Sequence, residues 1–149
     1  MTHGNPMSTR TRKAQKTYNQ YLKTTPKTDH CEFCNILEHR ENLLHETKSF
    51  MIIKNKFPYS QWDDQGVSEH LMIVPKKHTD TISSFTKSES VEFIDLLGSY
   101  EARDYDIAAR APKSNRKSIR HQHTHLIKLD RKTKNFMVFV KKPYLRIQK

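Results

Sequence analysis

Hydrophobic residues follow a polar N-terminal segment and come in short runs. The runs "SFMIIK" (residues 49–54) and "HLMIVP" (residues 70–75) are rich in β-forming residues and predict two strands. The polar segment between them, residues 55–69, contains Pro58 and Gly66 and predicts a loop or a loose hairpin. These two strands are the first elements of the expected core.

The longest helical pattern begins at a capping box. Thr86 is followed three residues later by Glu89, and apolar residues then recur at helical spacing, which predicts a helix that reaches about Ala109. Shorter helices are expected over "CEFCNILE", residues 31–38, and around residues 11–23.

The C-terminal third predicts two further strands after the basic loop "APKSNRK". "SIRHQHTHLIKL" (residues 118–129) is expected to be a strand, "DRKTK" (residues 130–134) a turn, and "NFMVFVKK" (residues 135–142) another strand. The elements together predict an α+β fold, with an antiparallel β-sheet of about five strands, one long helix and a short N-terminal helix.

The length of 149 residues suits a single domain. Residues 1–29 are polar and basic, so we expect a mobile N-terminal extension before a domain that spans residues 30–149. A solvated tail and a nucleic-acid contact arm are the two interpretations of this extension.

The net positive charge of the chain indicates an anionic partner. The chain has 27 Lys and Arg residues against 16 Asp and Glu residues, a formal net charge of +11, and only 34% hydrophobic residues. This charge favours a phosphate-bearing partner, whether a nucleotide, a nucleic acid or a membrane surface. The sequence has no apolar stretch of about 18 residues and no apolar secretory signal, so we expect a cytoplasmic protein without a membrane partner.

Three histidines alternate with other residues in the stretch at 118–129. In an extended strand His121, His123 and His125 would share one face, about 7 Å apart at a rise of about 3.3 Å per residue. Three interpretations are open: solvent-facing side chains, a three-histidine metal site, and nucleophilic catalysis at phosphorus. Catalysis requires an unprotonated imidazole that is oriented through its other nitrogen, with phosphate-binding donors nearby.

The segments "CEFC", "HLMIVPKKH" and "SIRHQHTHLI", in this order and spacing, resemble the histidine triad family of nucleotide hydrolases and transferases over residues 31 to about 130. The resemblance implies that His123 attacks the α-phosphorus and forms a covalent nucleotidyl-histidine intermediate. It implies that His125 contacts the transferring phosphate or assists the leaving group. It also implies a homodimer.

Nucleotide-binding residues follow from the same resemblance. Ser118 matches a family residue that binds the α-phosphate and is catalytic, and Asn55 matches an asparagine near the ribose. His70 either orients His123 or is a simple strand-end histidine. Gln122 and Thr124 replace apolar residues of the family pattern, so we expect a less buried rear face there.

No glycine-rich phosphate loop precedes Ser118. Cations occupy that segment and are expected at the mouth of the site: Lys113, Arg116, Lys117 and Arg120. We predict that Arg116 and Lys117 contribute to nucleotide binding, which favours dinucleoside polyphosphates, nucleoside phosphoramidates or nucleic-acid ends. Ordinary solvated loop cations are the alternative.

Cys31 and Cys34 are the only cysteines, and their spacing suits metal or redox chemistry in a reducing compartment. The resemblance to Cys-x-x-Cys members of the family implies a structural Zn²⁺ with the ligands Cys31, Cys34, His78 and His121. Two thiolates and two imidazoles would leave no open metal position. A free or redox-active cysteine pair is the alternative.

A function from a different class also fits the charge. The chain would then be a basic zinc-containing protein of the same fold that binds nucleic acid or processes its 5′ ends through the N-terminal extension. Steep salt dependence of nucleic-acid binding without nucleotide turnover would distinguish the binding protein from the enzyme.

Overall fold

One antiparallel sheet dominates the protein, which we describe from a computed structural model for residues 9–24, 31–133, 135–138 and 145–148. Five strands are adjacent in the order β1 (Leu43–Glu46), β2 (Phe50–Lys54), β4 (Gln65–Pro75), β6 (Thr124–Thr133) and β5 (Tyr105–Ala109). A sixth strand, β3 (Gln61–Trp62), pairs with β4, and β7 (Asn135–Val138) pairs with β8 (Leu145–Gln148) in a second sheet. The predicted α+β class is confirmed.

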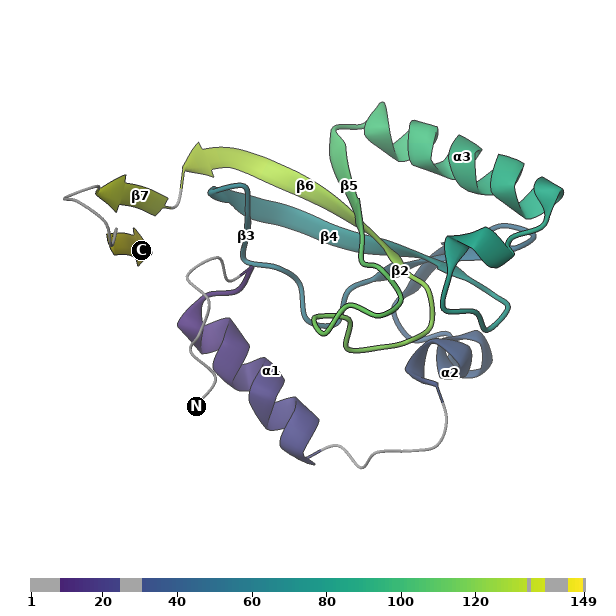
Figure 1. Ribbon diagram of the computed structural model, residues 1–149, viewed down its shortest axis with the longest axis horizontal. Coiled ribbons are helices and arrows are strands. Elements are labelled where there is room, and N and C mark those ends of the chain that lie inside the picture. Colours follow the sequence, from purple (N-terminus) through teal and green to yellow (C-terminus); the bar gives the residue numbers. More distant parts are fainter. Residues whose placement is uncertain (1–8, 25–30, 134, 139–144, 149) are drawn as a thin grey trace.

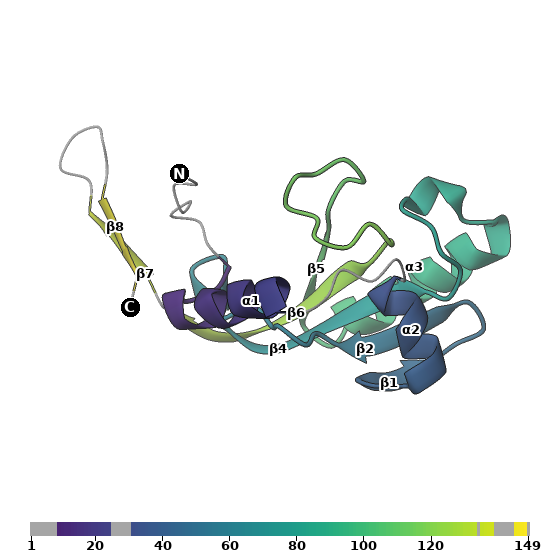
Figure 2. The same cartoon turned by 90° about the horizontal axis from the view of Figure 1, so that it is seen from below.

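Helices lie on both sides of the main sheet. Figure 1 shows α3 (Lys87–Glu101) above the sheet, and α1 (Arg12–Thr24) and α2 (Glu32–His39) below it. From below, α1 and α2 lie in front of the strands (Figure 2). Among the described residues, no helix combines the length and apolar character needed to cross a membrane.

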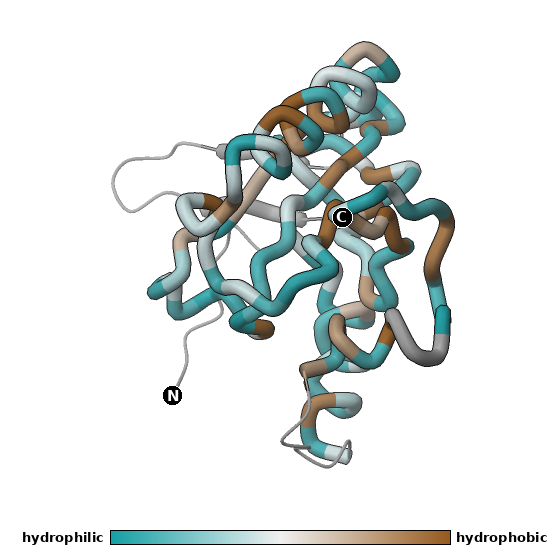
Figure 3. The backbone as a smooth tube through the Cα atoms, turned by 90° about the vertical axis from the view of Figure 1, so that its right-hand side faces the viewer, coloured by the Kyte–Doolittle hydropathy of each residue, from teal (hydrophilic) through white to brown (hydrophobic). Residues whose placement is uncertain are grey.

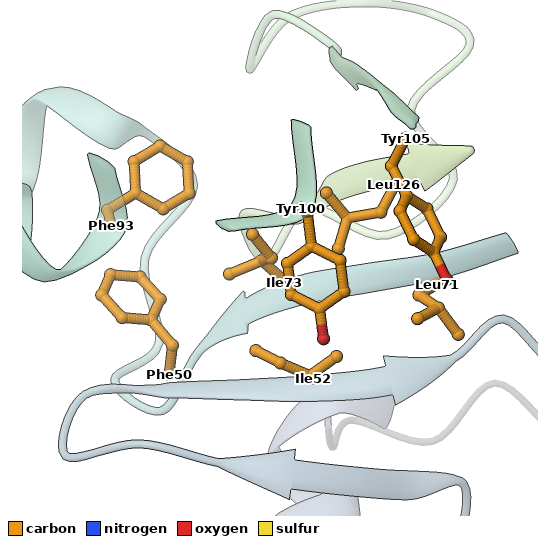
Figure 4. Close-up of a cluster of buried hydrophobic side chains, with 8 residues drawn as sticks. All are labelled: Phe50, Ile52, Leu71, Ile73, Phe93, Tyr100, Tyr105 and Leu126. Carbon is orange, nitrogen blue, oxygen red and sulfur yellow. The ribbon is translucent and has the colours of Figure 1, made fainter. Parts of the chain in front are cut away.

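The strands β2 and β4 each contribute to two apolar clusters because their side chains alternate between the faces. Leu71 and Ile73 of β4 belong to the cluster on the α3 side, together with Phe93 (Figure 4). Met72 and Val74 belong to the cluster on the α2 side. Hydrophobic residues come in short runs along the tube in Figure 3, separated by hydrophilic segments. His125 lies on the α2 side, because the next residue of β6, Leu126, faces α3.

The predicted helix is shorter than expected. Its capping box is present, since the Thr86 hydroxyl accepts a hydrogen bond from Glu89 N and the Glu89 carboxylate accepts one from Thr86 N. The helix ends at Glu101, whereas residues 105–109 form β5, so the predicted extension to Ala109 is wrong. Asp104 has a φ of 65° and reverses the chain, after which pairing with β6 determines the conformation.

The polar connection between the first two predicted strands contains a hairpin. Asp63 and Asp64 join β3 to β4 with φ angles of 45° and 63°, so both lie in the left-handed region that a two-residue type I′ turn requires. β4 therefore begins at Gln65, five residues earlier than the run of apolar residues predicts.

The histidine segment is only partly a strand. β6 begins at Thr124, so His121 and His123 precede the strand instead of lying within it. The strand also continues to Thr133 through most of the predicted turn. Outside the sheet ladder, the main chain before β6 is held by Gln122 N, which donates to Thr79 O at 2.6 Å.

The expected helix around residues 11–23 is present as α1, and it contacts the domain. The Arg10 guanidinium donates to Phe57 O at 2.9 Å, and the rings of Tyr18 and Tyr21 lie 5.1 and 4.7 Å from the Phe57 ring. The mobility of the N-terminal extension stays a prediction. The rest of that extension lies outside the described residues, and the domain boundary near residue 30 stays a prediction.

The last predicted strand, at 135–142, is present as β7 for residues 135–138. Residues 139–142 lie outside the described residues.

Candidate functional site

Three buried histidines meet on the α2 side of the sheet, where β4 and β6 are neighbours. His70 comes from β4, His125 from β6, and His123 from the segment just before β6. Their exposed fractions are 4%, 6% and 6%. The ring centroids of His70 and His125 are 5.0 Å apart, as are those of His123 and His125. The rings are therefore closer than the spacing of about 7 Å that a regular strand predicts.

Hydrogen bonds determine which nitrogens of His70 and His125 carry protons. Tyr59 N donates to His70 Nδ1 at 2.9 Å, so the proton of a neutral His70 is on Nε2. His70 Nε2 lies 2.9 Å from His125 Nδ1 and donates to it. His125 then carries its own proton on Nε2, which lies 3.5 Å from the Tyr59 hydroxyl. His125 Nε2 is thus a hydrogen-bond donor. His70 contacts His125 through this bond, whereas we had considered it as a partner of His123.

His123 has the opposite tautomer. Its Nδ1 lies 2.9 Å from the backbone oxygen of His121, and a carbonyl oxygen only accepts, so Nδ1 carries the proton. Nε2 of the neutral ring therefore has a free lone pair. Burial lowers the pKa of His123, which keeps the ring neutral near pH 7. An unprotonated nitrogen on an imidazole held through its other nitrogen is the form that a nucleophile requires.

Burial also keeps the neighbouring histidines neutral. It lowers the pKa of His70 to about 3 and that of His125 to about 2, with further lowering by the nearby charge of Arg10. His125 additionally lies near Arg110. Both arginines therefore bring positive charge to the side of the site that Tyr59 lines.

These depressed pKa values predict an acid-sensitive fold. Below pH 6.5 the unfolded chain binds protons at His70 and His125, whereas the folded protein binds them only near pH 3 and pH 2. Stability is therefore fully present above about pH 6.5 and declines as the pH falls, by about 1.4 kcal/mol per histidine for each pH unit. Urea unfolding at pH 7.5 and 5.5 measures the slope.

A matched pair of variants isolates this effect. His70→Asn should lower the number of protons that the chain takes up on unfolding by about one, and the slope of the free energy of unfolding against pH should fall accordingly. His45→Asn alters an exposed histidine in β1 and should leave the dependence unchanged. An equal pH dependence in the wild type and His70→Asn would contradict the prediction.

The loop before β6 carries the predicted phosphate-binding residues. Ser118 and Arg116 are exposed, and Lys113 and Arg120 are exposed as well. Lys117 is different, with an exposed fraction of 6%. Its ammonium donates to Asp80 O at 3.0 Å and to Gln122 Oε1 at 3.2 Å.

The rear face of the histidine segment is buried, so the expectation of a less buried face is wrong. Gln122 and Thr124 each have an exposed fraction of 2%. Gln122 remains compatible with burial because its side-chain oxygen accepts from Lys117 and its amide lies within 3.5 Å of the Thr124 hydroxyl. The buried Lys117 ammonium thus donates a hydrogen bond to the side chain of Gln122, for which the sequence alone indicated no partner.

Asn55 lies beside the histidines. Its side-chain nitrogen is 3.3 Å from His70 Nε2, and its side-chain oxygen accepts from Phe57 N at 2.9 Å. The structure therefore brings Asn55 to the same region as His123 and His125. Its contact with a ribose stays a prediction.

Sequence reasoning missed Tyr59, Arg110 and Arg10. The Tyr59 hydroxyl contacts His125 Nε2 and accepts from Arg110 Nη2 at 3.4 Å, while the Arg10 guanidinium lies 5.2 Å from the Tyr59 ring. The only signal for Tyr59 was an aromatic residue after Phe57 and Pro58 in an otherwise polar connection. The two arginines had no signal, because their proximity depends on α1 and β5.

A second cluster next to the histidines can hold a metal ion. Ligand atoms of Cys31, Cys34, His78 and His121 all lie within 4.8 Å of one another. His121 Nδ1 is 3.3 Å from Cys31 Sγ and 3.6 Å from Cys34 Sγ, and His78 Nδ1 is 3.4 Å from Cys34 Sγ. Ligand atoms around a tetrahedral zinc, with bonds of about 2.0–2.3 Å, are separated by about 3.3–3.8 Å. These three separations fall within that range, so the cluster could hold such an ion.

The tautomer of His121 also suits metal binding. Its Nε2 lies 2.9 Å from Pro75 O and donates to it, which leaves the Nδ1 lone pair directed at the two sulfurs. The backbone oxygen of His121 accepts the hydrogen bond from His123 Nδ1. A single residue therefore connects the cysteine and histidine cluster to His123.

Neither a protein-family model nor a curated protein matches the sequence. Solved structures do match the fold. A HIT family hydrolase from Clostridium thermocellum is 19% identical, with a TM-score of 0.53 over 71% of this chain and 96% of that chain. A HIT family hydrolase from Legionella pneumophila is 22% identical, with a TM-score of 0.52 over 69% and 95%. A histidine triad nucleotide-binding protein from Candida albicans is 19% identical, with a TM-score of 0.51 over 68% and 76%. The chain therefore has the histidine triad fold.

Proposed function

We propose that this protein is a histidine triad hydrolase or nucleotidyltransferase that acts at the α-phosphate of a nucleotide through a covalent nucleotidyl-His123 intermediate. The observation that carries this proposal is the pair of complementary tautomers. His123 has an unprotonated Nε2, and the adjacent His125 has a protonated Nε2. One ring is thus suited to attack phosphorus, and the other to donate a hydrogen bond to the leaving group.

The first step forms the Nε2–P bond on His123 and breaks the bond from phosphorus to the leaving group. The leaving group departs with the bonding electron pair, His125 Nε2–H donates a hydrogen bond to the leaving atom, and solvent supplies any proton that the leaving group takes up. His123 becomes positively charged in this step, and the His121 carbonyl that accepts from its Nδ1 stabilises that charge. In the second step water, or another acceptor hydroxyl, attacks phosphorus and releases its proton to solvent, while the Nε2–P bond breaks and returns its electron pair to His123 Nε2.

The substrates that we infer are dinucleoside polyphosphates or nucleoside phosphoramidates. Ser118 and Arg116 are exposed on the loop before His123 and would bind phosphate oxygens, while Asn55 would contact the ribose. Lys117 would contribute through the field of its charge, because its ammonium already donates to Asp80 O and Gln122 Oε1.

The inferred metal is a structural Zn²⁺ on Cys31, Cys34, His78 and His121. This donor set, with two sulfurs and two imidazole nitrogens, provides four ligands and no open position, so the ion would stabilise the fold. We also infer a cytoplasmic homodimer: the resemblance to the family favours the dimer, and the two free cysteines suit a reducing compartment.

Incubation with a panel of nucleotides tests the activity directly. We expect nucleoside monophosphate to be released and, when the reaction is stopped with base, a mass increase of one nucleotidyl group on the peptide that contains His123, since phosphoramidates are acid-labile intermediates. Mass spectrometry of intact protein and of its peptides measures both. Turnover without an adduct in rapid-quench samples would argue for direct attack by water. If the protein shows no turnover and forms no adduct with any nucleotide, the enzyme proposal is wrong.

A nucleic-acid-binding protein is the second candidate because of the composition of α1. This helix contains four cations and no acidic residue: Arg12, Lys13, Lys16 and Lys23. Binding of single-stranded nucleic acid with steep salt dependence, in a protein without nucleotide turnover, would favour this function.

A further inference from the structure

A pocket of about 420 Å³ lies between α1 and the segment that follows β2. Its lining includes three cations and two aromatic side chains but no Asp or Glu: Arg10, Lys13, Lys56, Phe57 and Tyr59. Pockets of roughly 300–1,000 Å³ with apolar walls and a few polar groups are typical of small-molecule sites. The charge and the aromatic walls suit an anion that carries a flat ring.

Tyr59 connects this pocket to the buried histidines. It lines the pocket, and its hydroxyl lies 3.5 Å from His125 Nε2. The same residue donates its backbone N–H to His70 Nδ1, which fixes the tautomers of both histidines. Tyr59 thus connects the pocket to the nitrogen that we assign as the hydrogen-bond donor to the leaving group.

Arginines reinforce the positive charge at the connection. The Arg10 guanidinium lies over two rings, 4.5 Å from the centroid of Tyr18 and 5.2 Å from that of Tyr59, and it donates to Phe57 O. Arg110 donates to the Tyr59 hydroxyl from the other side. These contacts place two cations around Tyr59, where an anionic group would be stabilised.

We propose that this pocket is a subsite for the leaving group, and that the leaving group is a second nucleotide. The inference rests on the proposed function, since it requires attack by His123 on an α-phosphate. Phosphates that depart from the α-phosphorus would contact Lys13 and Lys56, and the base would pack on the half-buried Phe57. α1 would then determine specificity for substrates with a large anionic leaving group.

Two substrates that give the same intermediate isolate this subsite. Diadenosine triphosphate and adenosine 5′-phosphoramidate both place AMP on His123, but one releases ADP and the other ammonia. The ratio of their kcat/KM values therefore reports on the leaving group alone. If the protein prefers guanine, the corresponding two guanosine substrates give the same comparison.

The first variant, Thr17→Trp, places a large ring at a position of α1 that lines the pocket. We expect the ratio of kcat/KM for the triphosphate to that for the phosphoramidate to fall about tenfold or more. The second, Lys13→Ala, removes an exposed charge without filling space and should lower the ratio about threefold to fivefold. Lys87→Ala, at the start of α3 on the opposite side of the sheet, is the charge-matched control and should leave the ratio unchanged.

The outcomes separate this proposal from the proposed function. A wild-type protein that turns over neither substrate contradicts the function, and calorimetric titration with ADP then tests the pocket alone, because Thr17→Trp should still weaken ADP binding about tenfold. A protein that turns over both substrates with an unchanged ratio in both α1 variants overturns the subsite. Circular dichroism verifies that α1 and the sheet remain folded in each variant.

Discussion

Replacing His123 by asparagine should lower nucleotide turnover by a factor of about 10⁴ or more while the protein stays folded. Asparagine is close to histidine in size, and its amide can still donate to the His121 carbonyl that now accepts from Nδ1. The substitution therefore removes the nucleophilic nitrogen and preserves the local hydrogen bond. Initial rates with the best nucleotide of the panel, together with the thermal unfolding midpoint, measure both expectations.

Two comparisons make the result specific for His123. His45→Asn changes an exposed histidine on β1, far along the sheet order from β6, and should retain full activity. His123→Asn should also lose the nucleotidyl adduct in rapid-quench mass spectra. A variant that keeps a tenth or more of the wild-type rate would show that His123 is not the nucleophile, whatever its effect on stability.

Removal of the proposed Zn²⁺ should lower the stability of the fold more than any other change that we propose. The candidate ligands join three segments that are distant in sequence: the start of α2, the residues after β4, and the segment before β6. Metal binding of this kind is coupled to folding, so a chelator or His78→Ala should lower the thermal unfolding midpoint by about 10 °C or more. His78 is exposed, so the variant loses a ligand without opening a cavity in the core.

Metal analysis and calorimetry together measure this effect. We expect about one zinc ion per chain in the wild type and substantially less in His78→Ala. His45→Ala is the matched control, because it removes an exposed histidine that is outside the cluster. A wild-type protein that binds no metal and unfolds at the same temperature with and without chelator would contradict the structural role.

Loss of the metal should also reduce turnover in the protein that remains folded. His121 contributes its Nδ1 to the cluster and its backbone oxygen to His123 Nδ1, so a displaced His121 would release the ring that is to attack phosphorus. This dependence connects the two largest expected effects through one residue.

Local sequence patterns were sufficient to predict helices and strands where side-chain periodicity and turn chemistry act within a few residues. The runs around Ile52 and Ile73 gave two adjacent core strands, and the Thr86–Glu89 capping box gave the start of α3. The end of that helix could not be predicted from local patterns. Residues 105–109 have helix-compatible side chains, but pairing of Tyr105 to Ala109 with β6 makes them a strand.

By itself, the sequence determined the class of fold, because side-chain periodicity and turn chemistry depend on spacing along the chain. The four residues of the cysteine and histidine cluster were implied by the resemblance to the histidine triad family and not by spacing. Only the tertiary structure decided the proton positions on His70, His123 and His125, since each depends on a backbone or side-chain partner from another segment or from a bend before β6. It also decided the burial of Lys117 and the position of α1 beside Tyr59. Contacts between distant segments are set by packing of the whole domain, and local patterns carry no information about them.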